Sequence, residues 1–371
     1  MRASRHSVML ANAVHKPFDT RIFHKEALSL LKAEWEVTII VPHTHDEEVQ
    51  GVKIEAVPLP RKGWEQLIKC PWHILRKACS HSRNAIYHIH DSELLLVGLV
   101  LRFTGRKVIY DAHEDTPRQI AYQHWIPGWI KLPYKGFYYL LEKICGWFFN
   151  AIIVAEPVIA RYYPKKKTYL VCNFPMAHAF VRDVVVPYSD RENVMVYVGL
   201  LSRVRGLAEM LEGYRLAKEK ISVVFKLGGK FAPVTLKEEL FATYDATYLG
   251  WVNYKMLVDE LYQSKIGIII PRPVERYKTN YPVKLFEYMA AGLPVIASKY
   301  GESAAFVKEA NCGVLVDPLN TQEIANAICW LLENKNEAAA MGMRGKKLIV
   351  EKYNWENESN VLLGIYERLQ Q

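Results

Sequence analysis

Residues 281–298, with the sequence YPVKLFEYMAAGLPVIAS, decide the fold of the second half of the chain. Pro282 suits the first turn of a helix, because the N–H that proline lacks would be unbonded there. Gly292 ends the helix, and the Val-Ile-Ala that follows predicts a short buried strand. Lys284 falls in the first turn, and Glu287 lies one turn later on the same side. A lysine at a helix start suits a diphosphate, and the carboxylate can accept ribose hydroxyls.

The residues before this helix complete a strand–loop–helix–strand unit. Residues 266–270 are apolar and predict a buried strand, and residues 271–281 form a polar loop. The ordinary interpretation is a well-packed unit of any doubly wound protein. Core packing alone would not require Lys284 and Glu287 together, so a binding site is the better interpretation.

The order P-x-K-x-F-E-Y-M-A-x-G-x-P-V-I from residue 282 to residue 296 resembles the signature of family 4 glycosyltransferases. These are retaining enzymes of the GT-B fold, in which two Rossmann-like doubly wound domains face each other across a cleft. They use nucleotide-activated sugars and need no metal. The resemblance implies that Lys284 contacts the diphosphate and Glu287 orients the ribose. The family often has a second Glu eight positions earlier, where this chain has Thr279, and this difference bears on how the donor sugar is held.

Length and composition predict two globular domains. The chain has 371 residues, half of them hydrophobic. Its six cysteines form no CxxC pair, which favours reduced thiols of a cytosolic protein over a disulfide framework or a zinc site. We expect no signal peptide in residues 1–10, and the most apolar segment, residues 144–155, is too short to span a bilayer.

The net charge of +9 is concentrated in the first half, where residues 1–175 hold 24 Lys or Arg against 16 Asp or Glu. Residues 61–83 and 125–149 interleave basic residues with tryptophan and other aromatic residues, a pattern typical of anionic membrane surfaces. A solvated helix packed on its domain by the tryptophans is the simpler alternative. Single-stranded nucleic acid is a rival partner, but no RNP, KH or helix-turn-helix signature supports it.

The chain opens with a predicted strand–helix–strand unit over residues 7–41. It has no GxGxxG sequence, so dinucleotide oxidoreductase chemistry loses its main support. The sequence Asp19-Thr-Arg21-Ile resembles the acceptor-side loop of bacterial family 4 enzymes that build surface polysaccharides. A helix N-cap is the structural alternative for Asp19.

Polar residues follow two further predicted strands, residues 85–90 and 107–111. His90 and Asp91 end the first, and His113 and Glu114 follow the second. Because ligands of open α/β sheets bind beyond the carboxyl ends of strands, these side chains can bond sugar hydroxyls or move a proton. A metal held by His88 and His90 is an alternative that matches no common zinc spacing. The resemblance favours His113 as a contact of the donor sugar or leaving group.

The second domain begins with a predicted strand at residues 194–198, a loop containing Arg203 and Arg205, and a helix from residue 207. Two arginines in a glycine-flanked loop before a helix suit phosphate. The resemblance points to Arg205 for the diphosphate; the family's usual earlier arginine aligns with Leu200, a role that Arg203 can take over. Trp251, after a later strand, either borders the base or packs in the core.

We therefore expect a GT-B enzyme with an acceptor-side domain (residues 1–175, plus a returning helix 355–371), a linker (176–192) and a donor domain (193–352). It would transfer a sugar from a UDP- or GDP-linked donor, with retention and without a metal, to a polyprenyl-linked saccharide at the inner face of the cell membrane, in capsule, exopolysaccharide or O-antigen assembly. An epimerase of the same fold and a non-catalytic nucleotide-sugar-binding partner stay open. The expected catalytic residues are His113, Glu114, Lys284 and Arg205; the donor-binding residues are Arg203, Arg205, Gly229, Trp251, Thr279, Tyr281, Lys284 and Glu287; the acceptor-side residues are Asp19, Arg21, His90 and Asp91.

Overall fold

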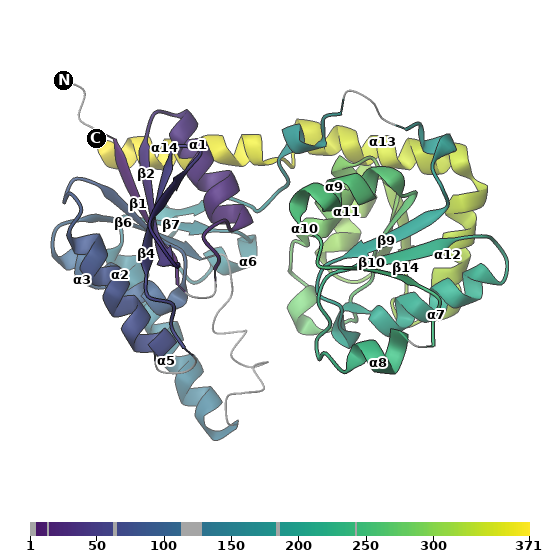
Figure 1. The fold of residues 1–371 in the computed structure, drawn as a ribbon, viewed down its shortest axis with the longest axis horizontal. Helices are drawn as coiled ribbons and strands as arrows, with labels where there is room; N and C mark the ends of the chain where they lie inside the picture. Colours follow the sequence, from purple (N-terminus) through teal and green to yellow (C-terminus); the bar gives the residue numbers. More distant parts are fainter. Residues whose placement is uncertain (1–4, 13–14, 62–64, 113–127, 183–185, 242) are drawn as a thin grey trace. The chain divides into compact units, whose positions relative to one another are not determined.

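The computed structural model describes residues 5–12, 15–61, 65–112, 128–182, 186–241 and 243–371. The chain forms two compact units (Figure 1): unit 1 is Met1–Asn173 with Glu356–Gln371, and unit 2 is Phe174–Trp355. Each unit contains its own sheet, with helices on its faces. Two doubly wound α/β domains were predicted from the sequence, and this part of the prediction is confirmed.

Unit 1 contains an eight-stranded sheet in the order β3-β4-β2-β1-β5-β6-β7-β8. Every neighbouring pair is parallel except β3 and β4, which are antiparallel. The central strands are apolar and buried on both faces, as expected where helices cover both sides of a parallel sheet. The strands are β1 (His6–Leu10), β2 (Glu36–Pro42), β3 (Glu47–Val49), β4 (Val52–Val57), β5 (Ile86–Ile89), β6 (Lys107–Ala112), β7 (Ala151–Val154) and β8 (Thr168–Leu170).

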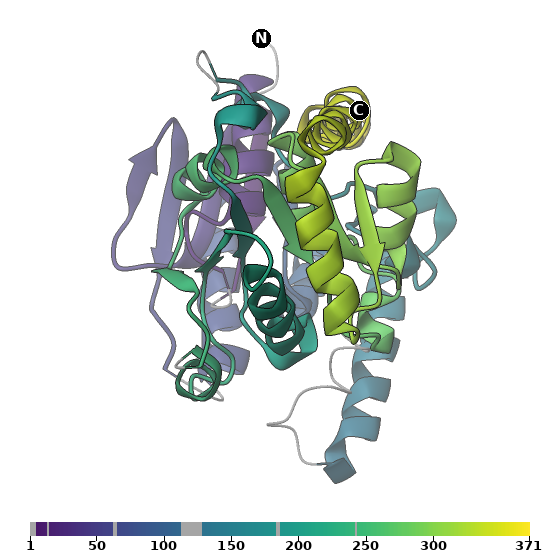
Figure 2. The same cartoon turned by 90° about the vertical axis from the view of Figure 1, so that its right-hand side faces the viewer.

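The helices of unit 1 include the last helix of the chain. Tyr366 of this helix is buried, and its hydroxyl lies 3.0 Å from both Ser7 Oγ and His88 Nδ1. The C-terminal segment is therefore part of the unit 1 core. The helices are α1 (Leu28–Lys32), α2 (Cys70–Cys79), α3 (Leu95–Phe103), α5 (Gly128–Phe148), α6 (Pro157–Ala160) and α14 (Trp355–Gln370). The first turns of α5 extend beyond the sheet in both views (Figures 1 and 2).

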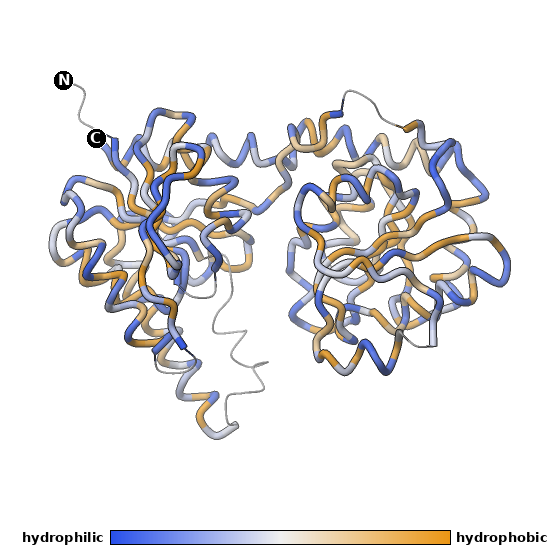
Figure 3. The backbone as a smooth tube through the Cα atoms, viewed as in Figure 1, coloured by the Kyte–Doolittle hydropathy of each residue, from blue (hydrophilic) through white to orange (hydrophobic). Residues whose placement is uncertain are grey.

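Unit 2 contains a six-stranded, fully parallel sheet in the order β11-β10-β9-β12-β13-β14. Its strands are β9 (Val194–Val198), β10 (Val224–Gly228), β11 (Thr247–Gly250), β12 (Ile266–Ile269), β13 (Val295–Ser298) and β14 (Gly313–Val316). Its helices are α7 (Leu207–Lys218), α8 (Leu236–Phe241), α9 (Tyr254–Gln263), α10 (Val283–Ala290), α11 (Glu302–Ala310), α12 (Thr321–Glu333) and α13 (Lys335–Glu351). Helices α7 and α12 pack together, and the strands form the hydrophobic interior (Figures 2 and 3).

The predicted helix at residues 21–31 differs in its first half. It begins as a wide π-helical segment, η1 (Thr20–Ala27), in which the N–H of His24 donates to the carbonyl of Asp19 five residues earlier. The wide turns direct Arg21 and Glu26 into the buried polar interior of unit 1. Residues 92–94 form a short 3-10 turn before α3, and β3 and β4 were not predicted. Within the described ranges, no helix combines the length and hydrophobicity needed to cross a bilayer.

Candidate functional site

A solvent-open pocket of about 340 Å³ lies at the carboxyl ends of β9 and β12 in unit 2. Strand β9 pairs with β10 on one side and β12 on the other, so the strand order reverses here. Open α/β sheets bind their ligands at such a switch point. Tyr197 comes from β9 and Ile269 from β12; the full lining is Tyr197, Arg205, Ile269, Pro271, Tyr277, Asn280, Pro282 and Ser303.

Three helix N-termini meet this pocket. Arg205 comes directly before Gly206, the N-cap of α7, Pro282 is the N-cap of α10, and Ser303 is in the first turn of α11. The first N–H groups of a helix have no partner within the helix, and the helix dipole makes that end positive. The pocket therefore has the chemistry of an anion site before any charged side chain is counted.

Arg205 supplies a cation to the pocket. Its guanidinium carbon lies 6.0 Å from the centre of the Tyr277 ring, and its buried Nε has no hydrogen-bond partner among the described residues. Arg203, predicted beside it, lies elsewhere: its Nη2 pairs with Glu239 Oε2 at 2.8 Å, and both side chains are half-exposed. Only one of the two predicted arginines lines the pocket.

Lys284 supplies a second cation behind Tyr197. Its Nζ lies 5.3 Å from the centre of the Tyr197 ring, and a Cβ added to Gly199 would lie 2.3 Å from Lys284 Cε. The lysine therefore occupies the space that the missing side chain of Gly199 leaves. Burial and, after it, the charge of Arg205 lower the pKa of Lys284 to about 7, and Glu287 opposes this effect. Before a ligand arrives, Lys284 is thus about half protonated at neutral pH.

Glycines at the ends of β9 and β10 let the two backbones lie in direct contact beside the pocket. Gly229 has φ +125°, and a Cβ added to it would lie 1.9 Å from the carbonyl oxygen of Gly199. Trp251 is 64% exposed, with Lys230 Nζ 5.2 Å from the ring centre. This exposure excludes the core alternative for Trp251.

Three other predicted donor residues do not line the pocket, although Thr279 and Tyr281 flank the lining residue Asn280 in the sequence. Thr279, Tyr281 and Glu287 are half-buried, and the Tyr281 ring packs edge-on against Phe306 at 4.9 Å. The sequence analysis missed four lining residues with polar side chains, Tyr197, Tyr277, Asn280 and Ser303. Position alone could have found Tyr197 and Ser303, because the first lies at a strand end and the second at a helix start.

Unit 1 has its own switch point, between β1 and β5, where the predicted acceptor-side residues gather. Asp19 is the N-cap of η1 and accepts the N–H groups of Arg21 and Ile22 at 2.8 and 3.1 Å. His15 bridges the two predicted aspartates: its Nδ1 lies 3.2 Å from Asp19 and its Nε2 lies 3.1 Å from Asp91. Because ionised carboxylates only accept hydrogen bonds, both ring nitrogens carry protons.

This arrangement makes His15 an imidazolium. Burial would lower the pKa of His15, but the hydrogen bonds to Asp19 and Asp91 raise it to about 10. Burial likewise would raise the pKa of Asp19, but His15 holds it below its usual range. His15 was not singled out from the sequence, since a lone histidine in a loop carries no signal.

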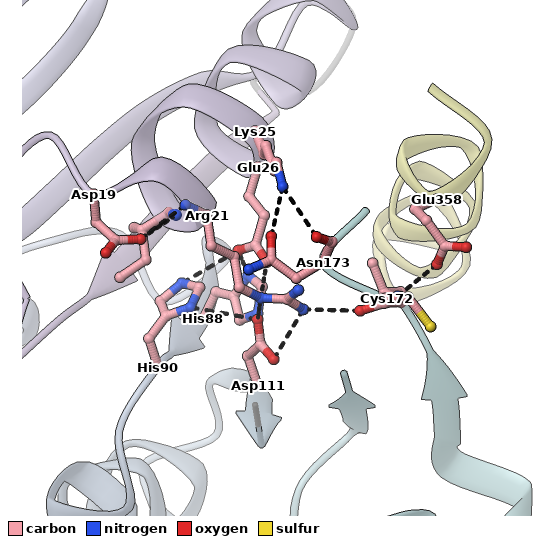
Figure 4. A network of polar contacts seen from close by, with 12 residues as sticks. Asp19, Arg21, Lys25, Glu26, His88, His90, Asp111, Cys172, Asn173 and Glu358 are labelled. Atoms are coloured by element: carbon pink, nitrogen blue, oxygen red, sulfur yellow. Dashed lines mark hydrogen bonds and ion pairs between the residues drawn. The ribbon is translucent and has the colours of Figure 1, made fainter. Parts of the chain in front are cut away.

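Arg21 lies inside unit 1, where it is 4% exposed (Figure 4). Its Nε and Nη2 donate to the two carboxylate oxygens of Asp111 at 2.7 and 3.1 Å, and Nη2 also reaches the carbonyl oxygen of Val171 at 3.1 Å. Its Nε lies 3.0 Å from Glu26. Arg21 therefore joins η1, β6 and the end of β8, and in this structure it does not reach the surface where an acceptor would bind.

His90 lies in the same network and is fully buried. Its Nε2 is 3.6 Å from Glu26 and its Nδ1 is 3.6 Å from Asp111. His88, His90, Glu26 and Asp111 have the donor atoms of a metal site, all within 4.8 Å of one another. Arg21 contacts both carboxylates and already supplies the positive charge that a cation would bring. The group is accounted for as an ion-pair network.

Two further contacts close this network at its edge (Figure 4). Lys25 is buried, and its Nζ donates to Asn173 Oδ1 at 2.6 Å. Glu358 of α14 accepts the N–H of Cys172 at 2.6 Å. These bonds fix the end of unit 1 around η1. His113 and Glu114, the predicted catalytic pair of this unit, lie outside the described residues.

The comparisons with known proteins match unit 2 in particular. The family described as Glycosyl transferases group 1 matches residues 184–348. This part of the chain is therefore similar to the group 1 glycosyl transferases. The chain is 25% identical over 182 residues to an uncharacterized glycosyltransferase of Methanocaldococcus jannaschii, which covers 48% of this chain and 45% of that protein. It is 29% identical over 165 residues to an MMP alpha-(1->4)-mannosyltransferase of Mycolicibacterium hassiacum, or 44% of this chain and 40% of that one. The matches thus span less than half of either relative.

The solved structures match both units of the chain. Sucrose-phosphate synthase from Thermosynechococcus elongatus has a TM-score of 0.77 at 19% identity, over 98% of this chain and 99% of that one. Anabaena HepE, solved with UDP and glucose, has a TM-score of 0.73 at 13% identity, over 98% and 100% of the two chains. At these identities the likeness shows the fold, which is GT-B, as predicted.

Proposed function

We propose that this protein is a glycosyltransferase that moves a sugar from a nucleotide-sugar donor to a lipid-linked saccharide, with retention at the anomeric carbon. The observation that carries the proposal is the convergence of three helix N-termini and Arg205 on one pocket at the switch point of unit 2, with Lys284 against the ring of the lining residue Tyr197. The group 1 glycosyl transferase match covers this pocket, and HepE, of the same fold, was solved with UDP and glucose. A UDP- or GDP-linked sugar is the donor class that fits.

In this reaction the bond between the anomeric carbon and the diphosphate oxygen breaks, and a bond to an acceptor hydroxyl oxygen forms. The hydroxyl proton passes to the departing diphosphate oxygen or to water, and the products are the extended saccharide and a nucleoside diphosphate. Negative charge develops on the departing diphosphate, so Arg205, Lys284 and the helix N-termini stabilise the transition state more than the ground state. Glu287 accepts the ribose hydroxyls. The positive charge comes from the protein, so the step needs no metal.

The acceptor side of the proposal rests on unit 1. Asp19 and Asp91 lie at its switch point, held by His15, and their carboxylates suit sugar hydroxyls. The basic, aromatic character of unit 1 supports an acceptor carried by an anionic membrane, at the inner face of the cell membrane. Assembly of a bacterial surface polysaccharide is the corresponding process.

To test this proposal, the full chain is incubated with radiolabelled UDP- and GDP-sugars and a bacterial lipid extract. The labelled sugar that is transferred to lipid is then measured in the organic phase. We expect one donor to be used and Arg205→Met to abolish the transfer. Arg203→Met is the matched control, because that arginine pairs with Glu239 at the surface and should retain activity. Conversion of the donor without any acceptor would instead indicate an epimerase. Donor binding without turnover in any extract would indicate a non-catalytic partner.

A further inference from the structure

Helix α3 presents apolar side chains to both sides. Its sequence, LLVGLVLRF, contains one polar residue, Arg102. Leu95 and Leu101 face the core and are fully buried, whereas Phe103 on the other side is 69% exposed. A helix that is hydrophobic all round is normally buried all round. The outer side of α3 therefore needs an apolar partner in place of water.

Helix α5 continues this apolar surface. The rings of Phe103 and Phe148 lie 5.2 Å apart, and α3 and α5 pack side by side (Figure 1). Trp147, one residue earlier, is 74% exposed. Hydrophobic stretches run along these helices at the periphery of unit 1 (Figure 3). We define the α3–α5 face as the exposed residues Leu96, Val100, Phe103, Leu140, Ile144, Trp147 and Phe148.

The exposed charges within α3 and α5 are positive. The acidic residue in the two helices is Glu142, which is 2% exposed and points into unit 1. Lys135 and Lys143 are exposed on α5. At its end, Arg102 donates to the carbonyl of Phe148 at 2.9 Å, and Lys167 donates to that of Trp147 at 2.7 Å. The face thus combines large apolar side chains with exposed cations, and the partly exposed acid next to it in the sequence is Glu93, three residues before Leu96.

We propose that the α3–α5 face inserts into the surface of an anionic lipid bilayer. Apolar side chains between lysines and arginines match the boundary between acyl chains and anionic headgroups, and aromatic rings are enriched there. A soluble partner protein would be expected to place acidic residues against only some of the exposed cations. With such a partner, polar contacts could replace the contacts of Phe103 and Trp147. The bilayer proposed here would carry the lipid-linked acceptor, so this inference rests on the proposed function. Vesicle binding can nevertheless be measured without any transfer of sugar.

The surface assigned here differs from the one expected from the sequence. The sequence analysis placed the contact on residues 61–83 and 125–149, through their tryptophans. The structure adds α3, which has no tryptophan and one basic residue, and places it next to the last turns of α5. Hydrocarbon insertion should therefore contribute to binding beside charge attraction.

The experiment is vesicle co-sedimentation of the full chain, with phosphatidylcholine vesicles containing or lacking phosphatidylglycerol, at physiological salt. We expect binding to the anionic vesicles and an at least roughly tenfold lower partition for Phe103→Ser with Trp147→Ser, because each removes a large apolar group from the lipid. The matched control changes exposed apolar residues of unit 2, Val234→Ser with Met343→Ser, and should bind as the wild type does. Lys135→Gln with Lys143→Gln should weaken binding to anionic vesicles only, and most strongly at low salt.

Further measurements distinguish a loss of lipid binding from misfolding, from self-association and from a loss of donor binding. All variants should keep the wild-type melting temperature and the wild-type thermal shift with nucleotide, since the changed residues are exposed and distant in sequence from the donor pocket. Brominated lipids should quench the fluorescence of the wild type more than that of Trp147→Phe. Equal vesicle binding by the Ser variants, or a wild type that ignores anionic vesicles, would overturn the proposal. A wild-type dimer that the same variants convert to monomers without any vesicle binding would assign the face to a second copy of the chain.

Discussion

The state of Lys284 predicts a pH dependence of donor binding. The pKa of this lysine in the unliganded protein is about 7, lowered first by burial and then by Arg205. A bound diphosphate brings negative charge to the pocket and raises that pKa, so binding takes up a proton. The protonated form is the one that binds well. Affinity is therefore full below pH 7 and is lost as the pH rises through 7.

The magnitude follows from the fraction of Lys284 that is protonated. With a pKa of about 7, the dissociation constant should rise by about tenfold between pH 6 and pH 8, and by about tenfold more at pH 9. Proton uptake on binding should be about one half at pH 7 and about nine-tenths at pH 8. A nucleotide sugar is the proper ligand, because its diphosphate is esterified at both ends and does not titrate near neutrality.

Isothermal titration calorimetry measures both quantities, with the donor that the protein selects and in two buffers of different ionisation enthalpy. Lys284→Arg is the control, because a guanidinium stays charged and the pH dependence should disappear even if the affinity changes. A dissociation constant that is the same at pH 6 and pH 8, with no buffer dependence of the enthalpy, would refute the reasoning.

Three further changes test the packing described above. Gly199→Ala should weaken donor binding at least roughly tenfold and lower the melting temperature, measured by calorimetry and thermal melting, because Gly199 has φ +147° and the new methyl group displaces Lys284, whose Cε lies 2.3 Å from the added atom. Arg21→Met should lower the free energy of unfolding in urea by about 3–5 kcal/mol, because Asp111 loses its buried partner. An unchanged urea midpoint would contradict the ion-pair network. Tyr366→Phe should cost about 1–2 kcal/mol in the same assay, since it removes the hydroxyl that joins α14 to the unit 1 core.

Prediction from the sequence was most accurate where a local pattern sets the limits of a helix or strand and also the position of a site residue. The helix and strand of residues 281–298 were confirmed as α10 and β13, because proline, glycine and the apolar spacing set their limits. Arg205 could be placed in the pocket because it directly precedes the glycine that opens α7. Side chains from distant parts of a parallel sheet meet at the strand ends, so the sequence could place Arg205 at the edge of the sheet where the pocket lies.

The sequence predicted poorly where long-range pairing decides. Arg203 and Arg205 look equivalent in the sequence, but Glu239, 36 residues away, holds the first at the surface. Arg21 was expected at the acceptor surface, but the wide turns of η1 direct it inward to Asp111. The exposure of Phe103 could not be predicted either, because an apolar helix gives no sign of which side stays uncovered.

The central claim is that the pocket of unit 2 binds the diphosphate of a nucleotide sugar. The most direct measurement is a thermal-shift panel of UDP, GDP, ADP and their common sugars, with Arg205→Met, Glu287→Ala and the control Arg203→Met beside the wild type. A ligand that binds the native state raises the melting temperature by mass action. We predict a shift with one nucleotide, kept in the control and lost in the two pocket variants. No shift with any nucleotide, or a shift that both pocket variants retain, would contradict the claim.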